Sequence, residues 1–314
     1  MLSELVNRSK PLKPNARVLV LGGGYSGGHV ARLLRALGTP VRCSRRSLNM
    51  PDADLVFDSA TGQIPTLNDL DGITHVLSTI PPTTEGQDPV LTQLGSQLRE
   101  RSLTWVGYLS TTGVYGDRQG RWVSEDDPAQ PGQPRSQRRY ACEQAWMDSG
   151  LPVQILRLPG IYGPGRSVLN SLRAGKARRI LKDDQVFCRI HVDDIAGACL
   201  HLMHRADDGP GPTIVNVSDD CPATPQDLLR YGAGLLNCEL PIEEPFEQAS
   251  RSMSAMARSF WSENRRVRNT LLCRQLGYSL LHPDFKAGLR DCFCLLYTSP
   301  SPRDYAATRM PSSA

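Results

Sequence analysis

The sequence lacks the segments that mark membrane and secreted proteins. No apolar run reaches the roughly 18 residues that a membrane-spanning helix requires, so we expect no segment to cross a bilayer. Residues 1–15 are polar and contain proline, without the apolar core of a secretory signal peptide. We therefore expect a flexible lead there and a cytoplasmic protein without a membrane partner.

The sequence also lacks a dominant charge and any paired cysteine motif. Lys and Arg number 36 against 32 Asp and Glu, and the net charge of +4 is well mixed along the chain. A nucleic-acid-binding protein would carry a clustered basic face, so we expect no nucleic-acid partner. The nine cysteines are scattered without the repeated spacing of zinc ligands. We expect reduced thiols, as in the cytoplasm, and no metal.

What the sequence does contain is a glycine-rich turn between an apolar run and a helical pattern. Gly22, Gly24 and Gly27 have the spacing G-x-G-x-x-G that is typical of dinucleotide-binding turns. The first glycine allows a tight turn, the second a close approach to a pyrophosphate, and the third close helix packing. The helix N-terminus then offers free N–H groups to phosphate. We predict that this turn, including Tyr25 and Ser26, binds a dinucleotide.

Two arginines lie in the exit loop of the next predicted strand, and strand and loop together span residues 39–46. In a dinucleotide fold an acidic residue about 20 positions past the glycines binds the ribose 2′-hydroxyl, whereas an arginine accommodates a 2′-phosphate. Here no acid is present, and Arg45 and Arg46 are adjacent. Guanidinium groups match phosphate in a bidentate way. The pattern favours NADP(H), with NAD(H) as the alternative cofactor and a solvated surface pair as the alternative interpretation.

Strands and helices alternate through the first half of the chain. We predict strands at residues 17–21, 39–46, 54–58, 74–80, 103–109 and 153–157, with helices after residue 24 and at 88–101 and 136–149. This alternation predicts an α/β fold with a doubly wound parallel sheet of the Rossmann type. We assign residues 16–160 to the dinucleotide-binding domain and 161–293 to a small C-terminal α/β lobe interleaved with it.

The last residues differ from the rest of the chain. Residues 294–304 resemble the conceptual translation of a transposase adapter used in sequencing libraries, and residues 309–314 resemble the flow-cell end of that adapter. We therefore exclude 294–314 from the fold and expect a non-native, disordered tail. The alternative is a natural disordered tail, since proline and serine favour disorder.

The sequence contains three motifs in the order in which a known family has them. They read LSTTGVYG at residues 109–116, LRLPGIYGPG at 156–165 and RIHVDDIA at 189–196. With the glycine turn, they make the chain similar to extended short-chain dehydrogenases/reductases, the NAD-dependent epimerase/dehydratase-like branch, and within it to an atypical subgroup. The resemblance covers about residues 18–289 and implies an NAD(P)-binding fold.

The resemblance also implies roles for individual residues. Asp58 matches the position that binds adenine, and Ile80 and Pro81 lie where a strand ends beside the cofactor. Pro159 is expected near the nicotinamide. Thr111 aligns with the catalytic Ser or Thr that hydrogen-bonds the substrate oxygen.

The acid/base pair of the family, a Tyr followed four residues later by a Lys, is broken here. In one register Tyr140 is the tyrosine, and Gln144 stands at the lysine position. Gln is neutral and cannot lower the pKa of the phenol. In the other, slightly preferred register, anchored on Glu143, the two positions hold Arg135 and Arg139. Tyr140 remains the candidate catalytic tyrosine of the first register only.

The resemblance implies an oxidoreductase or epimerase that acts at a carbonyl or hydroxyl carbon, with a nucleotide sugar as one candidate substrate. The broken pair supports a rival interpretation, a non-catalytic NADP-binding sensor or regulator. We expect a small-molecule partner and a monomer or homodimer. An anionic substrate or solvent would face the basic residues Arg135, Arg138, Arg139, Lys176, Arg178 and Arg179.

Overall fold

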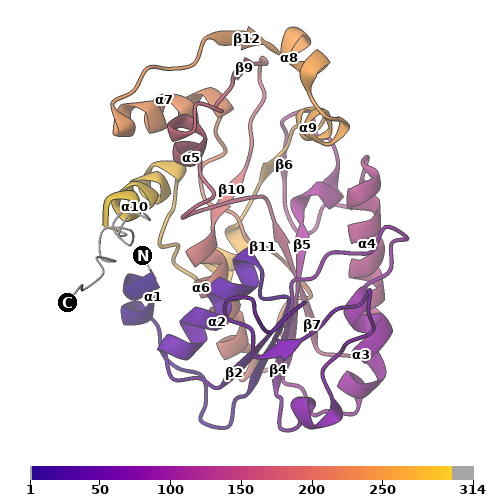
Figure 1. Cartoon of the computed structure of the whole chain (residues 1–314). Coiled ribbons are helices and arrows are strands. Elements are labelled where there is room, and N and C mark those ends of the chain that lie inside the picture. Colours follow the sequence, from indigo (N-terminus) through magenta and orange to yellow (C-terminus); the bar gives the residue numbers. More distant parts are fainter. Residues whose placement is uncertain (1, 299–314) are drawn as a thin grey trace, which may run out of the picture.

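The computed structural model describes residues 2–298 and contains a seven-stranded parallel sheet between two helical layers (Figure 1). The strand order is β11-β7-β5-β4-β1-β2-β3. These strands are β1 (Val18–Leu21), β2 (Val41–Arg45), β3 (Leu55–Val56), β4 (His75–Ser78), β5 (Trp105–Thr111), β7 (Val153–Leu158) and β11 (Ile214–Asn216). The predicted doubly wound α/β sheet is thereby confirmed.

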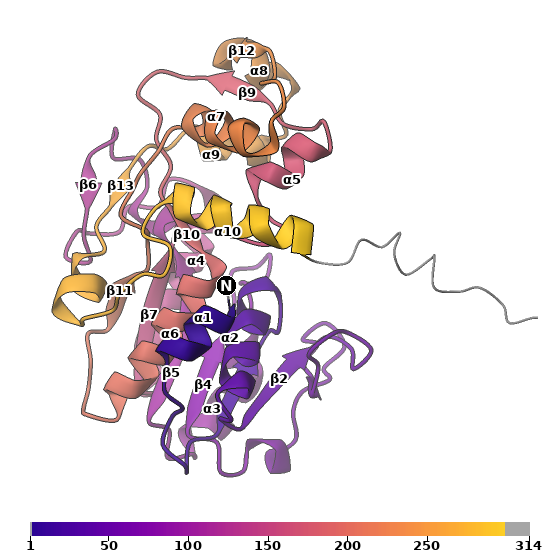
Figure 2. The same ribbon diagram turned by 90° about the vertical axis from the view of Figure 1, so that its left-hand side faces the viewer.

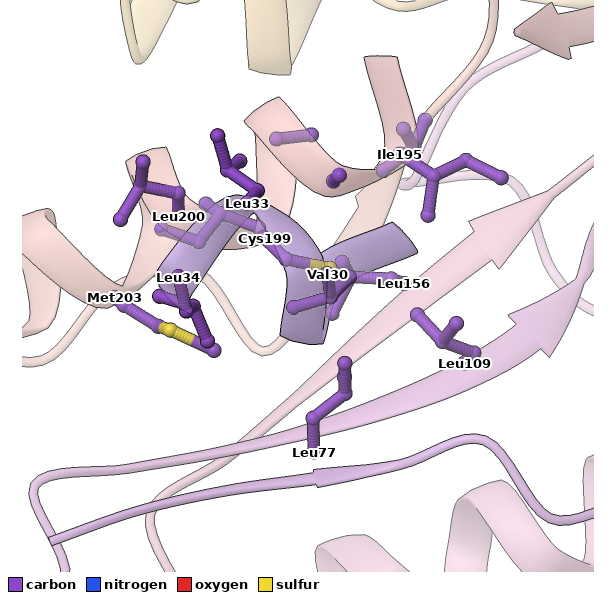
Figure 3. Close-up of a cluster of buried hydrophobic side chains, with 14 of the residues drawn as sticks. Val30, Leu33, Leu34, Leu77, Leu109, Leu156, Ile195, Cys199, Leu200 and Met203 are labelled. Atoms are coloured by element: carbon purple, nitrogen blue, oxygen red, sulfur yellow. The ribbon is translucent and has the colours of Figure 1, made fainter. Parts of the chain in front are cut away.

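Helices cover both faces of the sheet, so both faces are buried. Successive side chains of each strand point to opposite faces. Val18 and Val20 of β1 pack in one core, whereas Leu19 and Leu21 pack in the other. The first core contains helices α2 (Tyr25–Ala36) and α6 (Val192–Ala206), and the second contains α3 (Pro89–Arg99) and α4 (Pro134–Met147). Figure 3 shows apolar side chains of α2 and α6 directed toward the strands.

Strand order reverses direction between β1 and β4. From β1 the chain continues to β2 and β3 toward one edge of the sheet, and from β4 it continues to β5 and β7 toward the other edge. In open parallel sheets, ligands bind beyond the carboxyl ends of the strands at such a switch point. The glycine turn begins where β1 ends, so the fold places it at this point.

The C-terminal lobe lies above the carboxyl ends of the sheet (Figures 1 and 2). Helix α10 (Phe285–Thr298) packs against α5 (Val168–Arg173) and α7 (Pro225–Leu236). The lobe also contains helices α8 (Phe246–Ser252) and α9 (Ala255–Trp261). Short helical turns elsewhere are η1 (Leu67–Leu70), η2 (Thr112–Tyr115) and η3 (Leu271–Gln275). Three two-stranded sheets complete the fold: β8 (Gly160–Tyr162) with β10 (Arg189–His191), β9 (Arg179–Leu181) with β12 (Glu243–Pro245), and β6 (Trp122–Val123) with β13 (Arg266–Val267).

Both ends of the described chain differ from the expectations. The lead at residues 1–15 contains helix α1 (Leu2–Arg8), and Leu5 and Leu12 are buried against the core that includes α2 and α6. The expectation of a flexible lead was wrong because these leucines cover apolar surface. Helix α10 continues through residues 294–298, inside the segment expected to be a disordered tail, and Leu296 packs against the lobe core. The rest of that tail, 299–314, lies outside the described residues.

Among residues 2–298, none of the helices is both long enough and apolar enough to span a bilayer.

The fold predicts effects of different size for two substitutions in the glycine turn. A Cβ on Gly27 would lie 2.3 Å from the backbone oxygen of Gly22, whereas a Cβ on Gly24 would meet no atom within 4 Å. We expect Gly27→Ala to lower the free energy of unfolding by about 1–3 kcal/mol. Gly24→Ala, the matched control, should change it by less than about 0.5 kcal/mol. Urea denaturation measures both, and equal losses in the two variants would contradict this packing.

Candidate functional site

The glycine turn forms an open cradle at the start of α2. Gly22 has a φ of +96°, which side-chain-bearing residues rarely adopt, and its oxygen accepts a hydrogen bond from Thr79 Oγ1. Gly24 is the N-cap of α2 and provides no side-chain hydrogen bond to the first turn. The space beside Gly24 is open, as an approaching phosphate requires. The turn therefore fits the pyrophosphate of a dinucleotide.

The predicted adenosine-side residues lie on the neighbouring strands. Arg45 ends β2, and its Nε lies 3.2 Å from the place that a Cβ on Gly23 would occupy. Arg46 is exposed in the loop that follows. Neither arginine forms an ion pair with another residue in the range 2–298. Asp58 lies two residues beyond β3, where its carboxylate accepts a hydrogen bond from the N–H of Ala60 at 3.1 Å.

A cleft of about 840 Å³ lies between the carboxyl ends of β5 and β7 and the C-terminal lobe. Thr111 and Pro159, predicted for the substrate and nicotinamide ends, both line it. Ile80 lies between the turn and the cleft: it would contact a Cβ on Gly22, and its oxygen accepts from Arg139 Nη1 at 3.5 Å. The charged lining residues are Arg135, Arg139, Arg166, Arg189, Glu263 and Arg265.

A buried ion pair fixes the register of α4. Glu143 is fully buried, and its carboxylate accepts from Arg157 Nη2 at 2.8 Å and from Ser110 Oγ at 2.5 Å. These bonds join α4 to β5 and β7. Because Glu143 faces the sheet, the helix turns Arg135 and Arg139 toward the cleft. This geometry supports the register with arginines at both positions of the usual Tyr/Lys pair.

Tyr140 is not among the residues that line the cleft, although it neighbours Arg139 on α4. The structure therefore does not bring Tyr140 together with Thr111. The tyrosine that does line the cleft, Tyr162, is buried, and its hydroxyl donates to the Asp284 oxygen at 3.4 Å. Burial raises the pKa of Tyr162 above its ordinary value. Its environment is the opposite of the one that activates a catalytic phenol.

Tyr25 also makes a structural contact. Its hydroxyl donates to the Pro164 oxygen at 3.0 Å, which joins the glycine turn to the loop after β8. Burial raises the pKa of this phenol as well.

The basic residues expected near an anionic substrate divide into two groups. Arg135 and Arg139 line the cleft. Arg178 and Arg179 instead pair with Glu244 and Glu243 in the lobe, each at 2.6 Å. Arg138 and Lys176 do not line the cleft either. The solvated interpretation therefore fits the lobe residues, and the substrate interpretation fits the two arginines of α4.

His191 and Asp193 belong to a buried polar cluster. His191 Nδ1 accepts the N–H of Asp193 at 3.2 Å and so caps α6. An acceptor Nδ1 leaves the ring proton on Nε2, the nitrogen that faces Asp291 at 4.0 Å. A protonated nitrogen is not a metal ligand, so His191 in this state acts as the cap of α6.

The pKa of the neighbouring His282 is shifted in the opposite direction from that of His191. Its ring lies 3.8 Å from that of His191, between Asp194 at 3.0 Å and Asp291 at 3.7 Å. Burial alone would lower the pKa of His282, but the hydrogen bonds and charges of the two carboxylates raise it to about 9. Burial and the charge of His282 lower the pKa of His191 to about 3.

The fold, the open glycine turn and the adjoining cleft define a Rossmann-type protein. Residues 18–218 match the model of the NAD dependent epimerase/dehydratase family. The chain belongs to this family, as the three motifs predicted.

Known proteins resemble the chain over most of its length. Protein YeeZ of Escherichia coli K12 is 27% identical over 292 residues, which cover 85% of this chain and 97% of YeeZ. A functionally unknown protein from Silicibacter pomeroyi is 39% identical with a TM-score of 0.81, covering 89% of this chain and 98% of that structure.

Two more distant structures share the fold and were solved with ligands. Human epimerase family protein SDR39U1 with NADPH is 20% identical, with a TM-score of 0.68 and coverage of 88% and 99% of the two chains. MoeE5 with UDP-glucuronic acid and NAD is 19% identical, with a TM-score of 0.72 and coverage of 90% and 99%.

Sequence reasoning missed the cleft residues that come from the second half of the chain. Arg166, Phe260, Glu263 and Arg265 lie in segments without a recognisable motif. Arg189 is part of the motif RIHVDDIA, but nothing in the motif indicates that its side chain enters the cleft.

The two histidines predict how stability depends on pH. The raised pKa of His282 stabilises the fold below its unfolded value of 6.5, and this contribution is lost as pH rises through about 9. The lowered pKa of His191 destabilises the fold as pH falls below 6.5. Their combined contribution is therefore greatest near pH 6.5.

We expect the free energy of unfolding to fall by about 2 kcal/mol more between pH 6.5 and 8.5 in the wild type than in His282→Gln. Urea titrations at the two pH values measure this difference. Parallel pH profiles for the two proteins would contradict a charged His282.

Proposed function

We propose that the protein binds NADP(H) at the glycine turn and acts on the carbonyl or hydroxyl carbon of a small anionic molecule in the cleft. The observation that carries the proposal is the open space beside Gly24, at the N-terminus of α2. Arg45 lies near the adjacent Gly23 and donates to the Pro51 oxygen at 3.1 Å, without an ion-pair partner among the described residues. Gly22, Gly24, Tyr25, Ser26 and Gly27 would hold the pyrophosphate.

The other cofactor contacts follow from position. Arg45 and Arg46 would bind the 2′-phosphate, Asp58 the adenine, and Ile80 with Pro81 the adjoining ribose and nicotinamide side. Pro159 would contact the nicotinamide from the cleft. When bound, the nicotinamide would supply or accept a hydride. The NADPH complex of SDR39U1 and the NAD complex of MoeE5 support a nicotinamide cofactor but not a choice between the two.

At the substrate end of the cleft, Thr111 and Arg139 would contact the reacting oxygen. The Thr111 hydroxyl would donate a hydrogen bond to the substrate oxygen, and the Arg139 guanidinium would stabilise negative charge on it. Arginine keeps its proton at physiological pH, so the proton exchanged at that oxygen would come from water. A nucleotide sugar, as bound by MoeE5, is one candidate substrate. The nine unbridged cysteines support a cytoplasmic location.

The second candidate function is a non-catalytic NADP(H) sensor. The arginines at both positions of the proton-exchanging pair favour it, because neither can act as a general acid near neutral pH. Cofactor binding is common to both functions, and turnover distinguishes them.

Cofactor choice is tested by replacing both arginines. We expect Arg45→Ser/Arg46→Ser to weaken NADPH binding by about 10- to 100-fold, because charged hydrogen bonds to the 2′-phosphate are lost. NADH binding should change by less than about twofold. Fluorescence titration measures both. Arg42→Ser is the matched control, since Arg42 lies on β2 but pairs with Asp69 at 2.8 Å.

Catalysis is tested by NADPH consumption with a panel of anionic carbonyl compounds. We expect Thr111→Val to lower turnover about tenfold or more, since one hydrogen bond to the developing charge is lost. Tyr140→Phe should leave turnover unchanged because Tyr140 does not line the cleft. Loss of activity in Tyr140→Phe would restore the other register. A wild-type protein that binds NADPH but consumes none would favour the sensor.

A further inference from the structure

The cleft face of α4 carries two positive charges one helical turn apart. Arg135 and Arg139 are separated by four residues, and both line the cleft. Like charges at this spacing destabilise a helix. In residues 2–298 neither side chain forms an ion pair that would offset the repulsion. An anion placed between the two guanidinium groups would offset it.

Both guanidinium groups are held in place without carboxylates. Arg139 uses Nη1 for the Leu109 oxygen at 3.2 Å and the Tyr108 hydroxyl at 3.0 Å, so it lies against β5 two residues before Thr111. Arg135 stacks over the ring of Phe260, 3.7 Å from the ring centre. Fixed guanidinium groups lose little entropy on binding an anion and suit a planar carboxylate.

A third arginine that lines the cleft, Arg189, comes from β10 rather than from α4. Arg189 Nη1 donates to the Phe187 oxygen at 2.8 Å and the Ala223 oxygen at 3.1 Å. Within the described part of the chain Arg189 has no ion-pair partner, although burial lowers its pKa. The acid that lines the cleft, Glu263, is already paired with Arg265 at 2.7 Å. The carboxylates of Asp219 and Glu263 attract Arg189 and Arg135 from beyond ion-pair distance. Arginines still outnumber acids among the residues that line the cleft, so its lining carries net positive charge.

From this arrangement we infer that the substrate is a dianionic oxo or hydroxy acid. One carboxylate, adjacent to the reacting carbon beside Thr111, binds Arg135 and Arg139, and a second anionic group binds Arg189. This inference rests on the proposed function, and it names a substrate class that differs from nucleotide sugars. The second group is a carboxylate or a phosphate, since guanidinium binds both.

The probes are two acids that each carry two anionic groups, 2-oxoglutarate and 3-phosphohydroxypyruvate, and both are called dianions for these two groups. Uncharged dimethyl 2-oxoglutarate and UDP-glucose serve for comparison. Calorimetric titration into the NADPH-loaded protein measures binding independently of turnover. We expect at least one dianion to bind below about 1 mM and the diester not to bind. Preference for one dianion identifies the second group as carboxylate or phosphate.

Variants locate the two anion sites. Arg135→Gln and Arg189→Gln should each weaken binding of the dianion by about tenfold or more. Arg138→Gln is the matched control, because Arg138 neighbours Arg139 but packs beside Gly86 outside the cleft. NADPH affinity, measured on each variant, should stay within about twofold. If Arg189→Gln does not fold, Arg135→Gln on the surface of α4 still tests the inference.

Three results would overturn the inference. One is that neither dianion binds at about 10 mM while NADPH binds normally. Another is that Arg138→Gln weakens binding as much as Arg135→Gln. The third is that UDP-glucose binds more tightly than both dianions, which would assign the cleft to nucleotide sugars. Failure of NADPH binding itself would instead contradict the proposed function.

Discussion

The site depends on the close approach of α2 to the end of β1. Only a hydrogen atom fits between Gly27 and the backbone oxygen of Gly22. Because the helix begins so near the strand, its N-terminus lies at the switch point of the sheet, beside open space at Gly24. Positive charge from the helix end and from Arg45 meets at this place. A side chain on Gly27 would move the helix and separate these groups.

A second constraint decides the chemistry of the cleft. The buried pair of Glu143 and Arg157 holds α4 against β5 and β7. Removing either partner would leave an unpaired buried charge, which is costly. The rotation of α4 is therefore fixed, and Arg135 and Arg139 face the cleft where related proteins are expected to carry a tyrosine and a lysine. The cleft therefore carries two arginines on α4 at the positions where the family is expected to have its phenol and its lysine.

Much of this arrangement could be predicted because it is local. The glycine spacing and the apolar runs act through neighbours in sequence, and they placed β1 and α2 correctly. The motif at residues 109–116 placed Thr111 at the end of β5, where it lines the cleft, and its catalytic role stays a prediction. Leu5 was missed because its burial depends on α6, almost 190 residues later, which sequence periodicity cannot show. Arg189 and Phe260 were missed for the same reason, since only the folded lobe brings them to α4. The choice between the two α4 registers also needed the partner of Glu143, Arg157, which lies on β7.

The most direct test of the central claim is a crystal structure of the protein with NADP⁺. The account predicts the pyrophosphate at the N-terminus of α2, the 2′-phosphate in contact with Arg45 or Arg46, and the nicotinamide at the Thr111 end of the cleft. A cofactor bound elsewhere would contradict the account, as would a nicotinamide directed away from Thr111 and Arg139.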